Sequence, residues 1–516
     1  MAEKRGERRP DKKIVRGRWV IADSETVIDD GAVLIEGERI LETGAWADLR
    51  SRHGDVEVLG SDLVAVMPGL INAHHHSAGA TALQHGLPDL LLEPWILMHA
   101  RLRASDPYLD TLLSAARLLR TGVTSVVEAH SGRDSAEGYA AQCRNALEAY
   151  DRSGIRVAFA AGMRDQGYLV HGRDGDRDFL AGLPAELRSA AEATLPGENV
   201  LDRQDYFAIL DELHGHYRDH PRLEVWFGPP GPPWVSDGFL TAIAERAEAL
   251  DTGIQTHLEE SYYERLHGPR EYGRATLTHL AALGVLGPRY SIAHGVWLSE
   301  PEIEVLADSG AAVSHNPSSN LRLRAGIAPL NALLAAGATV ALGMDGTTLD
   351  DDEDMFTEMR LALRLNRSPR LGAPAPSPAE IFALATDGGA RLLRAAGRLG
   401  RLAPGTQADI VIVDLARATW PWTAPEAAPL EIVVQRCQAG DVETVLVAGE
   451  VVLAAGRPTR FDVESAGQEL AGRLTATPFP AEAAELAERL LPYLENYYRA
   501  WAHPRPAPYT SYNSRV

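Results

Sequence analysis

Residues 63–76, LVAVMPGLINAHHH, end an apolar run with two histidines one position apart, His74 and His76. Side chains two residues apart on an extended chain point to the same side, so this pair can bind one metal ion through neutral imidazoles. His75 points to the opposite side and is predicted to be structural. The pair alone is equally compatible with two hydrogen-bonded core histidines, so its meaning depends on the rest of the chain.

Three further candidate ligands each follow a short apolar run that is typical of a strand. They are His257 in IQTHLEES, His294 in SIAHGVW and Asp345 in ALGMDG. In a barrel of alternating strands and helices, the carboxyl ends of the strands converge on the face where active sites are built. This repetition favours one metal site at that face over a set of unrelated core histidines.

The middle of the chain, residues 67–399, alternates strand-like and helix-like segments. The strand-like segments after the one that ends at His74 are TSVVEA, IRVAFAAG, LEVWFG, GIQTH, YSIAH, AAVSH and ATVALGMD. Helical patterns lie between them, as at residues 106–122 and 237–253, and Gly253 is expected to cap the second of these helices. Eight strands with intervening helices predict an α/β fold with a closed parallel (β/α)8 barrel, a TIM barrel.

The two ends of the chain flank this barrel. Residues 12–66 and 400–456 are rich in strand-like segments, and each piece has too few strands to be stable alone. We therefore expect one small composite β domain built from both pieces. Residues 457–516 are predicted to be a C-terminal helical extension. Its segment PAEAAELAERLLPYLENYYRAWAH has apolar positions at helical spacing, which favours packing on the barrel.

The composition favours a large soluble enzyme. At 516 residues and 45% hydrophobic content, the chain can bury a substantial core. Its formal charge of -21 argues against nucleic acid or an anionic membrane surface as a partner. No segment approaches the ~20 apolar residues that span a bilayer, and the basic start lacks the apolar part of a secretory signal. We expect a cytoplasmic homodimer or larger homo-oligomer.

Cysteine and lysine usage limit the kind of metal site. The two cysteines, Cys143 and Cys437, are far apart and provide neither a disulfide framework nor a thiolate site. The lysines are Lys4, Lys12 and Lys13, all of which precede the candidate ligands. A two-metal centre bridged by a carboxylated lysine therefore has no lysine to use, and one divalent metal ion is expected.

Taken together, these segments resemble the amidohydrolase superfamily, in its branch of aminohydrolases and triazine chlorohydrolases. The resemblance runs from about residue 30 to 455, with the order of the motifs intact. The resembling stretches are PGLINAHHH, LLEPWI, RTGVTSVV, THLEE, AHGVWL, VSHNPSSNLRL, GIAPL, ALGMDG, DMFTEMR and GRLAPGTQADIVIVD. It implies a distorted (β/α)8 barrel with a small composite β-sandwich domain.

The same resemblance implies a role for each candidate residue. The metal ligands would be His74, His76, His257 and Asp345, with zinc as the preferred metal and iron as the alternative. His294 would orient the water that the metal activates, and Asp345 would accept a proton from it. Glu260, the third residue after His257, matches the proton-shuttling glutamate of the family. Its neighbour Glu259 is out of register and is expected either to be solvated or to lie behind the metal-binding residues without contacting the metal.

These roles predict a metal-dependent hydrolase that deaminates a small nitrogen heterocycle of purine, pteridine, pyrimidine or triazine type. A carboxylic acid positioned to donate a proton, such as Glu260, favours deamination over dechlorination. An amine must be protonated to leave, whereas chloride leaves unassisted. The alternatives are a chlorohydrolase or a cyclic-amidine or amide hydrolase with the same centre. A metal-free scaffold relative is a further alternative, although such a protein would be expected to lack the ligands that are present here.

Substrate contacts are predicted from positions beside the strand ends. The candidates are Gln84, Trp95, Arg164, Gln166 and His315, for which a structural role is equally compatible with the sequence. Trp95 is the preferred one, because a flat ring benefits from an aromatic wall. Glu128, His130 and Asn320 lie near the same face.

Two other groups of charged residues are interpreted as structural. The acidic run at residues 350–354 precedes the helix MFTEMRLAL and is expected to favour the positive end of that helix. His214, His216 and His220 are expected to lie on the surface rather than to form a second metal site.

Overall fold

The computed structural model describes residues 12–132, 135–197, 200–368 and 370–501. Lys4 and the last part of the predicted extension, residues 502–516, lie outside the described residues. Within the described part of the chain, no helix is long and apolar enough to cross a membrane.

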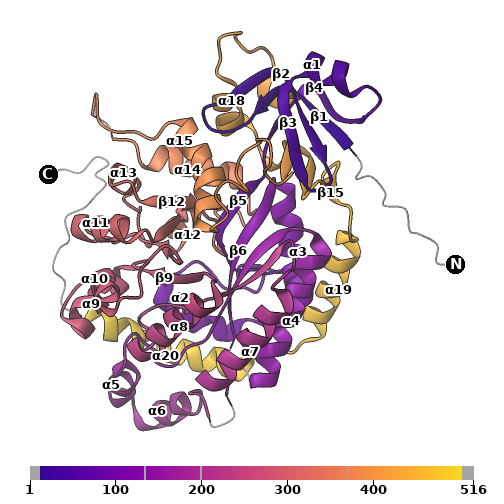
Figure 1. Cartoon of the computed structure of the whole chain (residues 1–516). Helices are drawn as coiled ribbons and strands as arrows, with labels where there is room; N and C mark the ends of the chain where they lie inside the picture. Colours follow the sequence, from indigo (N-terminus) through magenta and orange to yellow (C-terminus); the bar gives the residue numbers. More distant parts are fainter. Residues whose placement is uncertain (1–11, 133–134, 198–199, 369, 502–516) are drawn as a thin grey trace.

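Eight parallel strands form the predicted barrel (Figure 1). Each strand pairs with the next in chain order, and the barrel is nearly closed, because just after β12 the backbone N–H of Asp345 donates to the carbonyl of His74 in β5 at 2.9 Å. All eight predicted strands are confirmed. They are β5 (Leu70–His75), β6 (Val123–Ser131), β7 (Arg156–Gly162), β8 (Leu223–Phe227), β9 (Ile254–Leu258), β10 (Tyr290–His294), β11 (Ala312–His315) and β12 (Thr339–Leu342).

Helices surround the barrel and bury its outer face. The predicted helices at residues 106–122 and 237–253 are α3 (Pro107–Arg120) and α8 (Asp237–Leu250). The others of the barrel are α2 (Leu92–Met98), η1 (His99–Arg101), α4 (Ala136–Ser153), α5 (Gly175–Ala181), α6 (Ala185–Glu192), α7 (Arg203–Tyr217), α9 (Tyr262–Tyr272), α10 (Thr276–Leu283), α11 (Glu300–Ser309), α12 (Pro317–Arg322), α13 (Leu330–Ala335), α14 (Met355–Leu365), α15 (Pro378–Ala383), η2 (Leu384–Gly388) and α16 (Gly389–Leu392).

The expectation that Gly253 caps α8 is wrong. The helix ends at Leu250, and its C-cap is Asp251 in the left-handed conformation, with φ 54°. Gly253 instead lies against the ring of Trp226, a fully buried side chain in the core inside the barrel. A Cβ at Gly253 would lie 2.4 Å from a ring atom of Trp226. The glycine is therefore required by close packing and not by the end of the helix.

Gly253→Ala is expected to lower the free energy of unfolding by about 1–3 kcal/mol, because the added methyl group would overpack the rigid ring of Trp226. Gly238→Ala is the matched control. A Cβ at Gly238, in α8, meets nothing within 4 Å, so this change is expected not to destabilise the protein. Denaturant unfolding of both variants measures the difference, and equal stabilities would contradict this role of Gly253.

A second sheet combines strands from both ends of the chain, as predicted (Figure 1). Its strand order is β16-β15-β14-β13-β4-β1-β2-β3. The strands are β1 (Lys12–Ile21), β2 (Val27–Glu36), β3 (Arg39–Ala45), β4 (Glu57–Pro68), β13 (Ile410–Asp414), β14 (Val442–Val447), β15 (Glu450–Ala454) and β16 (Arg457–Pro458). The helices of this part are α1 (Trp46–His53), α17 (Ala416–Thr419), α18 (Pro429–Arg436) and η3 (Ala439–Asp441).

The stretch at residues 63–76 joins the two sheets. Its first half belongs to β4, which pairs with β1 in parallel and with β13 in the antiparallel sense. Gly69 follows, and a Cβ there would lie 2.0 Å from the hydroxyl oxygen of Thr124 in β6. The second half of the stretch 63–76 is β5, the first barrel strand. The composite sheet is thus attached directly behind the strand that carries the H-x-H pair.

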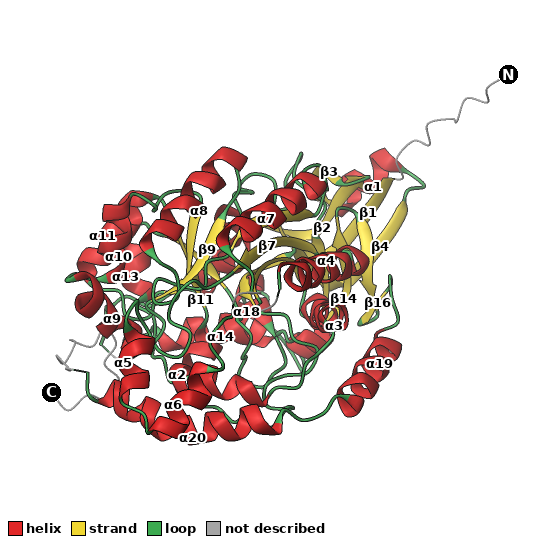
Figure 2. Ribbon diagram, turned by 90° about the horizontal axis from the view of Figure 1, so that it is seen from below, coloured by secondary structure: helices red, strands yellow, loops and turns green. Residues whose placement is uncertain are grey.

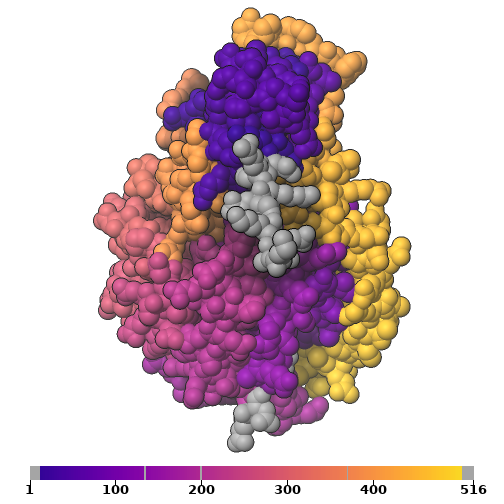
Figure 3. Space-filling model, turned by 45° about the vertical axis from the view of Figure 1, so that its right-hand side comes forward, coloured from indigo at the N-terminus to yellow at the C-terminus, as the bar shows by residue number. Residues whose placement is uncertain are grey.

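The C-terminal extension consists of α19 (Val463–Ala476) and α20 (Ala481–Arg499). Both helices lie along the outside of the barrel (Figure 2), and in the space-filling view the yellow end of the chain covers one flank (Figure 3). Leu470 of α19 packs with Leu109 and Leu112 of α3. Leu490 and Leu494 of α20 belong to a core cluster with residues of α5, α6 and α9. The prediction that this segment packs on its own barrel is confirmed.

Candidate metal centre and active site

Five predicted side chains converge at the carboxyl ends of the barrel strands. Nε2 of His76 lies 3.0 Å from Nε2 of His257 and 3.4 Å from Oδ1 of Asp345. The same Oδ1 lies 3.7 Å from Nε2 of His74, and Oδ2 lies 3.8 Å from Nε2 of His294. His294 and Asp345 have φ values of 79° and 58°, so the backbone turns sharply where β10 ends and just after β12. The structure therefore brings together five side chains that are spread over the sequence from His74 to Asp345.

Each of the four histidines uses its Nδ1 for a hydrogen bond that fixes the ring. Nδ1 of His76 lies 2.7 Å from the carbonyl oxygen of Ala129, and Nδ1 of His257 lies 2.8 Å from that of Pro230. A carbonyl only accepts, so both rings carry their hydrogen on Nδ1. Nδ1 of His74 lies 2.9 Å from the amide oxygen of Gln255, and Nδ1 of His294 lies 2.9 Å from the amide oxygen of Asn320.

These tautomers leave four Nε2 lone pairs that point to one place. Burial lowers the pKa of His74 to about 3 and that of His294 to about 4, so both rings are neutral near pH 7. The buried Nε2 atoms of these two residues have no hydrogen-bond partner in the described part of the chain. The 3.0 Å approach of His76 and His257 also sets two lone pairs against each other. A cation between these atoms resolves both problems, so the residues present fit a divalent metal.

Asp345 supplies the negative charge of this donor set. Burial alone would raise its pKa, but the facing histidines and the hydroxyl of Ser319 hold the pKa well below its ordinary value. Oδ2 accepts from the Ser319 hydroxyl at 2.5 Å, and Oδ1 accepts from the backbone N–H of Gly346 at 2.7 Å. Asp345 is therefore ionised and oriented toward the histidines.

Glu260 lies beside these ligands in surroundings that favour its protonated form. Its Oε2 is 3.5 Å from Nε2 of His294, and its side chain is buried. Burial raises its pKa well above the ordinary value, and the charges of Glu264 and Asp345 raise it further. A carboxyl group with a raised pKa is a suitable proton donor. The surroundings thus favour the ionised form of Asp345 and the protonated form of Glu260.

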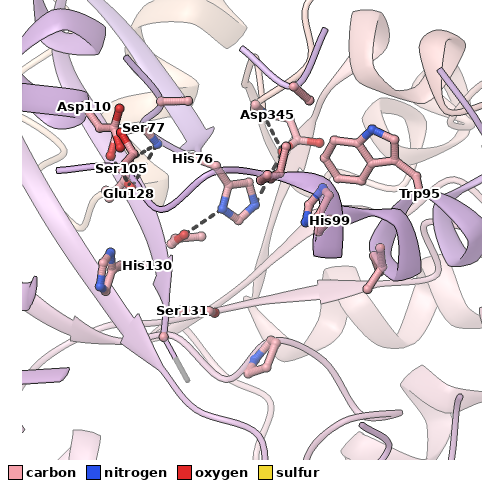
Figure 4. A pocket seen from close by; sticks show the side chains of 18 of the residues that line it. His76, Ser77, Trp95, His99, Ser105, Asp110, Glu128, His130, Ser131 and Asp345 are labelled. Carbon is pink, nitrogen blue, oxygen red and sulfur yellow. Dashed lines mark hydrogen bonds and ion pairs between the residues drawn. The ribbon is translucent and has the colours of Figure 1, made fainter. Parts of the chain in front are cut away.

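A cavity of about 540 Å³ opens onto this centre. His76, His257, Glu260 and Asp345 line it. Figure 4 shows Trp95 and His99 on one side of His76, and Ser77, Ser105, Asp110 and Glu128 on the other. The rings of Trp95 and His99 are in edge contact, with centroids 4.0 Å apart. The cavity therefore has an aromatic side and a polar side, with the candidate metal ligands between them.

Comparison with known proteins identifies the family. The profile of the amidohydrolase family matches residues 65–452, which include both sheets' central strands and all the candidate ligands. The chain belongs to the amidohydrolase family. A shorter match, at residues 31–55 of this amidohydrolase, is to the bacterial imidazolonepropionase-like composite domain.

Curated relatives of this amidohydrolase are deaminases. It is 31% identical to a 5-methylthioadenosine/S-adenosylhomocysteine deaminase of Nitratidesulfovibrio vulgaris, over 85% of this chain and 90% of the relative. It is 33% identical to a 5'-deoxyadenosine deaminase of Methanothermobacter thermautotrophicus, over 83% of this chain and 90% of the relative. The predicted hydrolysis of a C–N bond other than a peptide bond, with deamination as the reaction, is confirmed.

Solved structures agree on the fold. An adenosine deaminase from Xanthomonas campestris with bound zinc has a TM-score of 0.76 and 27% identity, over 91% of this chain and all of that one. An atrazine chlorohydrolase from Arthrobacter aurescens, complexed with zinc, has a TM-score of 0.72 but 23% identity, over 90% of this chain and all of that one. The second likeness shows the fold alone. Together with the donor set, the zinc-bound adenosine deaminase supports a divalent metal in this amidohydrolase.

Two of the five predicted substrate contacts, Trp95 and Arg164, line the cavity of this amidohydrolase. Gln84 does not, because its side chain is exposed and accepts from the backbone N–H of Thr81 at 2.9 Å. Gln166 does not either, because its amide donates to the carbonyls of Pro232 and Val235 at 3.3 and 3.4 Å.

His315, the remaining predicted contact, is buried away from the cavity. It lies on the same side of β11 as Val313, which packs in the outer core, whereas Ala312 packs inside the barrel. Burial lowers the pKa of His315 to about 4, so its ring is neutral. His315 is therefore a core residue of the layer between the barrel and its helices.

The neighbours of the predicted ligands are structural. His75 uses both ring nitrogens, one toward the carbonyl of Asp345 at 3.0 Å and one toward the hydroxyl of Ser114 at 2.7 Å. Of the two roles expected of Glu259, that of a solvated carboxylate is wrong. Glu259 is 1% exposed and lies 3.8 Å from the guanidinium of Arg265, because the chain reverses at its φ of 52° and turns the side chain inward.

The remaining charged residues have the structural roles that were expected of them. Asp354, in the acidic run, caps α14 by accepting from the backbone N–H of Phe356 at 2.9 Å. His216 is exposed, and His220 lies 3.3 Å from the carboxylate of Asp151, near the surface. Within the described residues, the groups able to hold a metal include none of the histidines at 214, 216 and 220.

Two buried acids near Glu260 were missed from the sequence. Glu93 in α2 accepts from the hydroxyl of Ser261, and burial raises its pKa to about 7. Glu264 in α9 accepts from the backbone N–H of Glu260 at 3.2 Å, and burial raises its pKa to about 8. An acid inside the apolar stretch LLEPWI was the available signal for Glu93. Glu264 carries no signal that distinguishes it from a surface acid of α9.

Gln255→Leu is expected to weaken metal binding by about 10–100-fold. The change keeps the volume of the side chain but removes the acceptor that fixes the Nδ1 tautomer of His74. Competition with a chelator measures the affinity. Gln166→Leu is the matched control, because Gln166 contacts backbone carbonyls away from the cavity. Equal affinities in both variants would show that Gln255 does not orient a ligand.

Proposed function

We propose that this amidohydrolase deaminates an adenine nucleoside with a modified 5' position, using one divalent metal, with zinc preferred over iron. The metal would be held by His74, His76, His257 and Asp345, and His294 would orient the reacting water. The observation that supports this most strongly is the convergence of four Nε2 atoms on an ionised carboxylate beside a protonated one. The substrate class is supported by the relatives that deaminate methylthioadenosine, S-adenosylhomocysteine or 5'-deoxyadenosine.

The side chains divide the proton transfers between them. A bound divalent metal lowers the pKa of its water to about 7 and so supplies hydroxide near neutrality. Asp345, held ionised by its neighbours, accepts the proton at a carboxylate oxygen. Glu260 donates from Oε2 to a ring nitrogen of the base, which makes the adjacent amino-bearing carbon more electrophilic. Asp345 then gives its proton to the departing amine, Glu260 regains a proton from the new hydroxyl group, and ammonia leaves as the C=O bond forms.

The cavity suits such a substrate in size and in its walls. A volume of about 540 Å³ is within the range of sites for small ligands. The ring of Trp95 and the neutral ring of His99, whose pKa burial lowers to about 4, meet edge to face and provide an aromatic wall for a base. The polar side of the cavity remains available for the sugar and the 5' substituent.

Ammonia release tests this proposal. The metal-loaded enzyme would be assayed with methylthioadenosine, 5'-deoxyadenosine, adenosine, guanine and cytosine, and with a chlorotriazine for chloride. We expect ammonia from the adenine nucleosides, with the modified ones preferred, and no chloride. Chloride without ammonia would establish the chlorohydrolase alternative, and ammonia from cytosine or guanine alone would replace the substrate class. A cytoplasmic location and a homodimer or larger homo-oligomer remain predictions.

A further inference from the structure

The wall of the active-site cavity contains an arginine side chain, Arg103, whose positive charge has no ion-pair partner in the described residues. Arg103 follows η1 and lines the cavity together with His85 and Ser105. Its Nε donates to the carbonyl of Thr477 at 3.2 Å, but within the described residues neither terminal nitrogen of its guanidinium donates to the protein or forms an ion pair. A guanidinium has five N–H donors in a planar fork that matches a carboxylate. Most of this fork is therefore available to a ligand.

His85 adds a second donor at the same place. Its Nδ1 accepts from the backbone N–H of Arg103 at 3.3 Å, so the hydrogen of the ring is on Nε2. Burial and the nearby charge of Arg103 lower the pKa of His85, which keeps the ring neutral. A charged fork and a neutral N–H donor in one wall of a cavity are the groups that bind a carboxylate.

The guanidinium is held in place by the chain end. The C-terminal strap, residues 477–479, connects α19 to α20 and crosses beside Arg103. Thr477 accepts from Nε, and the ring of Phe479 lies 5.4 Å from the guanidinium carbon of Arg103. Arg101 lies 5.7 Å from the same ring but does not line the cavity, and its ion pair with Glu488 of α20 is exposed and adds little to the position of the strap. The charge of Arg103 is thus positioned by a segment 374 positions away in the sequence.

We propose that Arg103, positioned by the C-terminal strap and assisted by His85, binds a carboxylate at the 5' end of the substrate. This inference rests on the proposed nucleoside deaminase function and deepens it. The same cavity is lined by the carboxylates of Asp110 and Glu128, which would repel a phosphate dianion. A monoanionic carboxylate with a neighbouring ammonium, as in an α-amino acid, meets less repulsion. The 5' substituent favoured by this wall is therefore a thioether that ends in an amino acid.

Two thioether substrates that differ at this end provide the test. S-adenosylhomocysteine carries the amino acid, and methylthioadenosine lacks it. The ratio of their kcat/KM values is measured in the metal-loaded enzyme, in Arg103→Met and in Arg101→Met, the matched control, since Arg101 contacts the same Phe479 ring. We expect Arg103→Met to lower the ratio, S-adenosylhomocysteine over methylthioadenosine, by about 10–100-fold, as expected for a lost charge-assisted hydrogen bond. Arg101→Met is expected to change it less than threefold.

One further variant tests the role of the strap, and one further substrate tests which kind of anion Arg103 binds. Phe479→Leu is expected to lower the same ratio through a higher KM for S-adenosylhomocysteine, with kcat kept, because the strap acts through Arg103. Adenosine 5'-monophosphate is expected to be a poorer substrate than S-adenosylhomocysteine. The reverse order would show that Arg103 binds a phosphate rather than a carboxylate, and it would overturn the proposal. Ammonia from both thioethers with an unchanged ratio in Arg103→Met would refute this inference alone. Ammonia from neither would refute the deaminase function and the inference with it.

Discussion

Glu260→Gln is expected to keep its metal but to lose deaminase turnover by about 10²–10⁴-fold. Glutamine has nearly the shape of a protonated glutamic acid, so the variant should fold and leave the ligands in place. It has no carboxyl proton to give to the ring nitrogen, and general acid–base catalysis contributes about this factor. Single-turnover kinetics with saturating substrate measure the loss directly, and metal content per chain is measured on the same sample.

Glu264→Gln is the matched control for this prediction. Glu264 is equally buried, and its pKa of about 8 leaves it mostly protonated at pH 7, so glutamine resembles its native state. It contacts the backbone of Glu260 rather than the cavity. Near-normal turnover is expected for this variant. If Glu260→Gln also turned over normally, Glu260 would have no part in the reaction, whatever the geometry around it.

His257→Ala is expected to abolish stoichiometric metal binding and, with it, activity. The change removes one of the four proposed ligand atoms and leaves a gap beside Nε2 of His76, which lies 3.0 Å from Nε2 of His257. Loss of the metal should also lower thermal stability, because a ligand at 1,000 times its dissociation constant stabilises the folded state by about 4 kcal/mol. Metal analysis and thermal unfolding, each with and without added zinc, measure the two effects.

His130→Asn is the control for the second prediction. His130 also lines the cavity and is partly buried, but it belongs to none of the groups that can hold a metal in the described residues. It is expected to keep one ion per chain and to show the same stabilisation by zinc as the natural protein. Stabilisation of His257→Ala by zinc to the same extent would place the ion elsewhere.

The barrel and its ligand set could be predicted because they depend on short-range patterns. Strand alternation places His74 and His76 on one side, and the parallel barrel brings His257, His294 and Asp345 to the same end without any knowledge of the loops. Trp95 was predicted from the motif that contains it.

Features that depend on loop paths or on close packing were not predictable in this way. Gln84 lies near His76 in sequence, but its loop turns it to the surface. Gly253 resembled a helix cap because the ring of Trp226 that requires it is 27 positions earlier. Arg103 carries no signal of its own, since its position is set by a strap 374 residues away.

The central claim is that one divalent cation lies among the Nε2 atoms of His74, His76 and His257 and a carboxylate oxygen of Asp345. A crystal structure of the zinc-loaded enzyme, with anomalous scattering recorded on both sides of the zinc absorption edge, tests it most directly. We expect a single anomalous peak per chain, in contact with these four side chains. A crystal of active enzyme in which these rings point apart, or in which the peak lies at another set of residues, would contradict it.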